Sequence, residues 1–374
     1  MAVPVHPERR PKRNALAIEL TGYCNQKCGY CYNDWRGDKK ESQALPTAQL
    51  LELIERAATE VEWDHVTLTG GEPFARADLF VLLEKLKEHN LRALIISNGG
   101  LITEAHAKRL APYKPYFVQI TLNGPERELH EEHVGRGHFD ATLTGINALV
   151  AEGVAVSGCV VVTRKNAHKV GDILALWHSL GVRDVALSRY SPAGYASEQV
   201  AELLPSRTEL LGALRAAEPW ARDRDMKLQV TMPVPPCVVD PSEFPSIRFS
   251  SCPIGTEAQE FALGTDGNLR NCTLHTDVVG ETSQGESFAS AVSAPRVAQY
   301  RDVTPAFCEP CPKRAQCMGG CGAAAVSVFG ARGLDPFVAQ HVDDAFAANL
   351  SASRAGTTSF VPAGRLARRT ASAS

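Results

Sequence analysis

The chain has 374 residues, enough for two or three domains with a buried core, and its 44% hydrophobic and 22% charged residues exclude a wholly disordered protein. Its 39 Lys and Arg residues are balanced by 42 Asp and Glu residues, so the net charge of -3 provides no basic field that would hold nucleic acid or an anionic membrane surface. No apolar run has the length of a membrane-spanning helix or of a signal peptide, and we expect a cytoplasmic protein with no nucleic-acid or membrane partner.

Alternating β-like and helix-like runs fill the chain between residues 15 and 200. This alternation is typical of repeated β-α units around a parallel sheet, and it predicts an α/β fold. The preceding residues 1–14 lack apolar periodicity and are expected to form a flexible tail. Six strands are predicted, beginning near Ala15, His65, Ala93, Phe117, Ser157 and Asp184.

A Pro-rich segment separates this region from a second, smaller one. Residues 201–248 contain a predicted helix over Glu209–Trp220, followed by a Pro-rich linker at a domain boundary. Residues 249–346 are rich in Gly and Cys and poor in long apolar runs, so we expect metal sites rather than a large core to order them. Residues 347–374 are small, polar and basic, and are expected to form a second flexible tail.

Three cysteines directly follow the first predicted strand, spaced as Cys24-x3-Cys28-x2-Cys31. The carboxyl end of a strand is where parallel α/β sheets and barrels place their active sites. Three thiolates there can hold three irons of a 4Fe-4S cluster and leave the fourth iron open to a small molecule. The alternative is a structural zinc ion, which normally takes four protein ligands, and this loop offers no fourth Cys or His.

This motif, with the aromatic Tyr30 just before its last cysteine, resembles the signature of radical S-adenosylmethionine (SAM) enzymes. Gly70-Gly71-Glu72 follows the second predicted strand, in the order that the family has. The resemblance implies a partial (β/α)6 barrel that binds one 4Fe-4S cluster and SAM, with Glu72 and the adjacent backbone at the SAM amino group. The implied chemistry is reductive cleavage of SAM to a 5′-deoxyadenosyl radical, which takes a hydrogen atom from a substrate.

Later strand ends also match the family pattern. Thr121 and Arg136 correspond to residues that help to hold the SAM carboxylate, whereas Asn123 stands where the family often has Asp, which argues against an acid-base role there. Each of these alone would be an ordinary turn residue, so the prediction depends on their combination with the cysteine motif. The other residues that the resemblance places around SAM are Ser97, Asn98, Val162 and Leu187, the last two beside the adenosine.

A second group of cysteines has the spacing Cys308-x2-Cys311-x5-Cys317-x3-Cys321 and is preceded by Cys252 and Cys272. This pattern resembles the SPASM extension of radical SAM enzymes, which carries two auxiliary 4Fe-4S clusters. Six cysteines at these spacings argue against the alternative, a zinc ribbon. The resemblance assigns a nearer group, Cys252, Cys272 and Cys321, to one cluster and a farther group, Cys308, Cys311 and Cys317, to the other.

Each auxiliary cluster lacks one evident ligand. The family usually has a further cysteine where this chain has Val338, so His341 or Asp335 is a candidate ligand of the farther cluster, and the alternative for His341 is a helix position at the surface. The nearer cluster is either open to substrate or completed by Cys237 from the linker. Cys237 has two further interpretations, a catalytic hydrogen-atom donor to a substrate radical or an inert buried thiol. Cys159 lies within an apolar strand, where we expect a structural role.

The sequence constrains the substrate less than the cofactors. The resemblance favours a peptide that is crosslinked, oxidised or epimerised during natural-product maturation, and the alternative is radical chemistry on a sugar, nucleoside or other small molecule. A non-catalytic iron-sulfur carrier would not need the SAM-binding residues. With 14 residues before the first strand we expect no fused peptide-recognition domain. The expected partners are therefore a separate recognition protein and an external electron donor of the flavodoxin or ferredoxin type.

Overall fold

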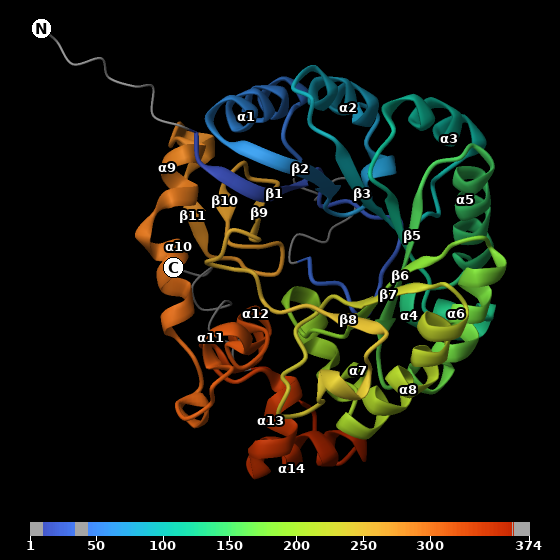
Figure 1. Cartoon of the computed structure of the whole chain (residues 1–374), viewed down its shortest axis with the longest axis vertical. Helices are drawn as coiled ribbons and strands as arrows, with labels where there is room; N and C mark the ends of the chain where they lie inside the picture. The colour runs from blue at the N-terminus through green and yellow to red at the C-terminus, as the bar shows by residue number, and fades with distance from the viewer. Residues whose placement is uncertain (1–9, 34–43, 361, 363–374) are drawn as a thin grey trace, which may run out of the picture.

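The computed structural model describes residues 10–33, 44–360 and 362. At its centre is a curved sheet of mostly parallel strands, which Figure 1 shows with helices along its outer side. All six predicted strands are present and parallel, which confirms the predicted α/β fold. They are β1 (Lys12–Glu19), β2 (Glu62–Thr69), β3 (Ala93–Ser97), β4 (Val118–Thr121), β5 (Val156–Val162) and β6 (Asp184–Arg189).

Two further parallel strands, β7 (Lys227–Val230) and β8 (Ile247–Phe249), extend the sheet beyond β6. β7 and all but the last residue of β8 lie within residues 201–248, which the sequence analysis described only as a helix and a linker. They are four and three residues long and flank the Pro-rich run, so neither shows a periodicity long enough to predict. The linker is therefore built into the sheet.

The helices of this region turn apolar faces toward the sheet. In α1 (Thr47–Glu60), for example, Leu50 and Leu53 are buried on one face. In α8 (Arg207–Asp223), the side chain of Ser206 caps the first turn by accepting a backbone N-H. The remaining helices are α2 (Leu79–Glu88), α3 (Glu104–Leu110), α4 (Arg127–Val134), α5 (Phe139–Ala151), α6 (Val170–Ser179) and α7 (Val200–Leu203).

The Cys-rich segment continues the same sheet on the other side of β1. β9 (Glu260–Leu263) pairs in parallel with β1, with Ala15 opposite Glu260, and β10 (Leu269–Arg270) and β11 (Val278–Gly280) follow in antiparallel order. The described residues thus form an eleven-stranded sheet in the order β11-β10-β9-β1-β2-β3-β4-β5-β6-β7-β8. Short helices complete this segment (Figure 1): α9 (Phe288–Ser293), α10 (Pro295–Gln299), α11 (Arg314–Cys317), α12 (Gly322–Phe329), α13 (Pro336–Val342) and α14 (Asp344–Arg354).

Two buried ion pairs fasten the Cys-rich segment to the barrel. Arg270 of β10 pairs with Glu19 of β1, and Arg189 at the end of β6 pairs with Asp335, with 2.7 Å between Nη2 and Oδ2. All four side chains are at most 3% exposed. Because an unpaired buried charge is costly, these pairs constrain how the two parts of the chain pack together.

Of the two predicted tails, residues 1–9, 361 and 363–374 lie outside the described residues. Residues 12–14 of the first tail belong to β1, and residues 347–354 of the second belong to α14. Within the described ranges, no helix combines the length and the apolar character needed to cross a bilayer.

Candidate functional site

The first cysteine motif lies in the loop after β1, at the carboxyl ends of the parallel strands. Cys24, Cys28 and Cys31 are all half-buried. Gln26 contacts two of them, because its backbone N-H donates to Cys24 Sγ at 3.4 Å and its Oε1 accepts from Cys28 Sγ at 3.5 Å. Burial, together with the charges of Glu72 and Cys31, raises the pKa of Cys24 to about 11. The loop therefore holds these sulfurs in a partly desolvated position.

The end of β2 packs directly on the backbone of this loop. The N-H groups of Gly71 and Glu72 donate to the carbonyl oxygens of Thr21 and Tyr23, at 2.6 and 2.8 Å respectively. A Cβ atom on Gly71 would lie 1.9 Å from the Tyr23 oxygen, so glycine is required here. The glycine pair thus lets one strand end touch the cysteine loop.

Glu72 is fully buried, and its carboxylate accepts three hydrogen bonds from neighbouring groups. Oε1 accepts from the Phe74 N-H at 3.0 Å and from the Ser97 hydroxyl at 2.8 Å, and Oε2 accepts from the Asn98 N-H at 2.8 Å. Burial raises the pKa of Glu72 to about 7, although the three hydrogen bonds oppose that shift. The carboxylate therefore ties the end of β2 to the end of β3.

Asn98 and Tyr30 bring two further predicted residues to the cysteine loop. Asn98 Nδ2 donates to Asn25 Oδ1 at 2.7 Å and lies 3.5 Å from Cys24 Sγ. Tyr30 is hydrogen-bonded to Cys28, and burial raises the pKa of its phenol well above the usual range. Both residues therefore contact cysteines of the motif directly.

The other predicted SAM contacts differ in accessibility. Arg136 follows the end of α4, is exposed, and forms no ion pair with any described residue. Thr121 at the end of β4 is hydrogen-bonded to the Cys159 thiol. Val162 and Leu187, in β5 and β6, are at most 2% exposed and belong to the main hydrophobic core. Arg136 thus offers an available cation, whereas the side chains of Val162 and Leu187 pack in the interior.

Asn123 is fully buried just beyond β4 and bridges two strand ends. Its Oδ1 accepts from the Val161 N-H at 2.8 Å, and its backbone carbonyl accepts from Asn166 Nδ2 at 3.1 Å. The position where the family often has Asp is therefore occupied here by a structural amide, a role that the sequence analysis did not identify.

The nearer cysteine group lines a cavity of about 200 Å³. Cys252, Cys272 and Cys321 are free thiols, and backbone N-H groups are hydrogen-bonded to all three sulfurs. Burial and the charge of a neighbouring cysteine raise the pKa of Cys252 to about 11. Glu260 of β9 lines the same cavity, accepts from the Thr67 hydroxyl at 2.5 Å, and has a pKa raised by burial.

Tyr32 connects the first motif with the nearer group. It follows Cys31 directly, and its side chain packs on a small apolar cluster that contains Cys321 and lies beside Met232. Its hydroxyl lies 3.2 Å from the Thr69 hydroxyl. Cys321 and Met232 also line the 200 Å³ cavity, so Tyr32 packs on the same apolar cluster as one wall of that cavity, although it is not itself among the described lining residues. The sequence analysis missed Tyr32, and its position next to the last cysteine of the motif was the only available signal.

Asp335 fixes the backbone of Cys321. Its Oδ2 accepts from the Cys321 N-H at 2.7 Å and pairs with Arg189, whose guanidinium also donates to the Pro233 carbonyl oxygen at 3.0 Å. Asp335 was considered as a ligand of the farther cluster. Its carboxylate is instead engaged, fully buried, with Arg189 and the loop of the nearer group.

The farther cysteine group lines another cavity, of about 170 Å³. Cys308, Cys311 and Cys317 share this cavity with Cys237. Burial raises the pKa of Cys308, and the charges of Cys317, Cys237 and Cys311 raise it further. Cys237 therefore lies with the farther group, whereas the sequence analysis considered it as a ligand of the nearer one.

Val338 stands where the family has a further cysteine, and His341 was considered as a substitute ligand. The two residues differ in burial and in whether they line the cavity. Val338 is fully buried and lines the 170 Å³ cavity. His341 is exposed on α13, and its ring packs edge-on against Phe337 with 5.8 Å between ring centroids. His341 is not among the described residues that line the cavity.

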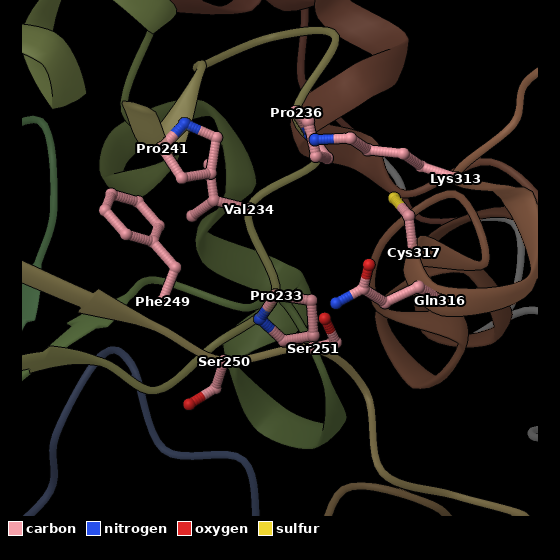
Figure 2. Close-up of a pocket in the computed structure, with 10 residues that line it drawn as sticks. All are labelled: Pro233, Val234, Pro236, Pro241, Phe249, Ser250, Ser251, Lys313, Gln316 and Cys317. Atoms are coloured by element: carbon pink, nitrogen blue, oxygen red, sulfur yellow. The ribbon is translucent and has the colours of Figure 1, made fainter. Parts of the chain in front are cut away.

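An adjoining cavity of about 230 Å³ separates the linker from the farther group (Figure 2). Its lining includes Pro233, Pro236 and Phe249 together with Lys313 and Cys317, and Figure 2 shows the Lys313 side chain running toward Pro236. In Figure 2 the sulfur of Cys317 points toward the segment that carries Pro236. The Pro-rich segment therefore faces the farther group.

The donor sets fit iron-sulfur clusters. Among the residues that the structure describes, no three His, Cys, Asp or Glu side chains form a group compact enough for one metal ion. A 4Fe-4S cluster instead places each thiolate on a separate iron, so its ligands are spread around a larger body. The cysteines of the first motif share one loop, and those of the nearer and farther groups each share one cavity. Sets of this kind, with backbone N-H donors to their sulfurs, suit the separate irons of a 4Fe-4S cluster.

Comparison with known proteins supports this assignment for the first part of the chain. Residues 18–176 match the family model of the Radical SAM superfamily. Mycofactocin maturase MftC from Mycobacterium tuberculosis is 30% identical over 192 residues, which are 51% of this chain and 48% of that protein. PqqA peptide cyclase from Gluconobacter oxydans is 26% identical over 332 residues, which are 86% of this chain and 89% of that protein. This chain thus spans about half the length of the maturase.

Solved structures show a similar fold. Streptococcus suis SuiB bound to its precursor peptide SuiA matches with a TM-score of 0.66 and 17% identity over 84% of this chain and 73% of that chain. The protein anSMEcpe, with bound AdoMet and a peptide, matches with a TM-score of 0.68 and 18% identity over 91% of this chain and 99% of that chain. The residues that match the Radical SAM superfamily model, 18–176, include the first cysteine motif and Glu72.

Proposed function

We propose that this protein is a radical SAM enzyme that modifies a peptide, and that its C-terminal segment is of the SPASM type with two auxiliary 4Fe-4S clusters. The observation that carries the proposal is the 200 Å³ cavity, which the nearer cysteine group lines, together with the packing of Tyr32, directly after the first motif, on the apolar cluster that contains Cys321. A substrate in this cavity would lie between two candidate cluster sites. The similarity to a peptide cyclase along 86% of the chain favours a peptide over a small molecule.

In this proposal Cys24, Cys28 and Cys31 hold three irons of the first cluster. When bound, the reduced cluster and SAM supply a 5′-deoxyadenosyl radical that takes a hydrogen atom from the substrate. The backbone beside Glu72, with its carboxylate, receives the SAM amino group, and Arg136 neutralises the SAM carboxylate. The Arg136 guanidinium is exposed and forms no ion pair within the part of the chain that the structure describes, which supports this role.

The remaining residues of the site position these groups. Asn98, with its amide 3.5 Å from Cys24 Sγ, orients the cluster ligand, while Ser97 holds Glu72. Tyr30 and the strands that carry Val162 and Leu187 border the adenosine, and Thr121 assists at the SAM carboxylate. The surrounding barrel keeps water away from a reactive radical.

Glu260 is a candidate proton acceptor in the substrate cavity. After a hydrogen atom is taken, the peptide radical must lose one proton and one electron to complete its oxidation; a buried carboxylate with a raised pKa can take the proton, and the nearer auxiliary cluster would take the electron. The hydrogen bond from Thr67 holds the carboxylate in place. In the cell, an external flavodoxin or ferredoxin would deliver the electron, and a separate protein would present the peptide.

The test uses anaerobically reconstituted protein with SAM and a reductant, and it measures 5′-deoxyadenosine. Extract of the source organism is divided into macromolecular and small-molecule fractions, and each is added before and after protease treatment. Stimulation by the protease-sensitive macromolecular fraction is the expected result. Stimulation by the small-molecule fraction alone would replace the peptide with a metabolite. Absence of 5′-deoxyadenosine in every mixture would contradict the proposed activity.

A further inference from the structure

We propose that Cys237 is a ligand of the farther auxiliary cluster, in place of the cysteine that the family carries where this chain has Val338. The inference rests on the proposed function only for the nature of the cluster. The farther cluster would then have four thiolate ligands from this chain, Cys237, Cys308, Cys311 and Cys317.

The shared cavity is the first support. The four cysteines line the same 170 Å³ space, although Cys237 is 71 residues before Cys308 in the sequence. Cys308 and Cys311 are held by a turn in which the Cys311 N-H donates to the Cys308 carbonyl oxygen at 2.9 Å. Lys313 lines the same cavity.

A defined turn presents Cys237 to this cavity. The N-H groups of Val238 and Val239 both donate to the Pro235 carbonyl oxygen, at 2.9 and 3.2 Å. Arg207 Nε donates to the Val238 carbonyl oxygen at 2.5 Å and ties the turn to the start of α8. Because the prolines also restrict the backbone, the thiol needs little ordering to bind iron.

The residues of α13 at this cavity also support Cys237 as the fourth ligand. Val338 lies fully buried on α13 and lines the same cavity, where its side chain offers no ligand atom. His341 packs against Phe337 and is not among the described lining residues. Because α13 contributes no ligand to this cavity, the farther group alone has three thiols there. Cys237 from the linker therefore supplies the fourth.

The assignment also settles how the eleven cysteines are divided. The first motif takes three, and Cys159 is 7% exposed within β5 and hydrogen-bonded to Thr121. With Cys237 at the farther cluster, the nearer cluster has three cysteines in this chain. A 4Fe-4S cluster held by these three cysteines would have one iron without a cysteine ligand from this chain, and the three cysteines line the same cavity as Glu260.

The experiment measures iron and acid-labile sulfide per chain, with Mössbauer and electron paramagnetic resonance spectra. The background protein carries alanine at all three cysteines of the first motif, so every bound iron is auxiliary. Adding Cys237→Ala should remove up to half of the auxiliary iron, or convert one 4Fe-4S signal to that of a three-iron cluster. Adding Val338→Cys to that variant should restore the iron, and Cys159→Ala is the control that should keep it.

The outcomes separate this inference from the proposed function. Unchanged iron and unchanged spectra in Cys237→Ala, with iron lost in Cys308→Ala, would overturn the inference and leave the auxiliary clusters in place. A background protein that binds no iron at all would overturn the auxiliary clusters and the inference together. Circular dichroism of each variant, and the rescue by Val338→Cys, distinguish loss of a ligand from loss of folding.

Discussion

Replacing Asp335 with alanine removes the carboxylate from a fully buried ion pair. Arg189 Nη2 loses a partner at 2.7 Å, and the N-H groups of Cys321 and Phe337 lose acceptors at 2.7 and 2.8 Å. Removing one partner of a buried pair costs about 3–5 kcal/mol, since the other charge stays buried without compensation. Two orphaned N-H groups place the expected cost at the upper end of that range. Such a loss is a large part of the ~5–15 kcal/mol that stabilises a typical protein.

Urea unfolding of the anaerobically reconstituted protein, followed by tryptophan fluorescence, measures this cost. Asp335→Asn keeps an acceptor but not the charge, so its midpoint should fall between those of the unsubstituted protein and Asp335→Ala. The control is Asp223→Ala, which breaks an ion pair with Arg222 whose side chains are 52% and 62% exposed. This control should shift the midpoint little because exposed pairs are screened by solvent. Equal midpoints for Asp335→Ala and Asp223→Ala would refute the reasoning.

Three other predictions concern the SAM site. Alanine at Cys24, Cys28 and Cys31 together should abolish 5′-deoxyadenosine formation while auxiliary iron remains, and retained SAM cleavage would contradict the cluster assignment. Arg136→Ala should weaken SAM binding about tenfold or more, consistent with the loss of one charge-assisted contact, without changing the iron content measured on the same sample. The pKa of Glu72, raised by burial from 4.5 to about 7, means that the folded state binds the extra proton between these values, so stability should fall as pH rises across that interval. In urea titrations of the apo-protein, Glu72→Gln should flatten this decline, and an identical slope in both proteins would count against a raised pKa.

The fold could be predicted where the sequence has long local patterns. β1 to β6 are each an apolar run bounded by turn residues, and the six predicted strands were confirmed. β7 and β8 were missed because a strand of three or four residues beside prolines has no period to detect. The pairing of β9 with β1 joins residues about 245 positions apart, and no local pattern encodes such a register.

The same distinction applies to the candidate sites. The first motif has its three cysteines within eight residues of one loop, so sequence spacing already implies spatial proximity. In the sequence, the rest of the linker and β8 lie between Cys237 and the nearer and farther cysteine groups, and only the packing shows which group Cys237 joins. Asn123 was noted for departing from the family pattern, but its bridge to β5 depends on a neighbouring strand.

The buried ion pair between Arg189 and Asp335 anchors both the linker that carries Cys237 and the loop that carries Cys321. Asp335 accepts from the Cys321 N-H and so positions the nearer group, while Arg189 donates to the Pro233 carbonyl oxygen, four residues before Cys237. Cys321 itself is four residues after Cys317 of the farther group. The linker that carries Cys237 and the loop that carries the other ligands are therefore anchored to the same two side chains. If Cys237 is a ligand, Asp335→Ala should lower the occupancy of both auxiliary clusters, whereas Cys237→Ala should affect only the farther one.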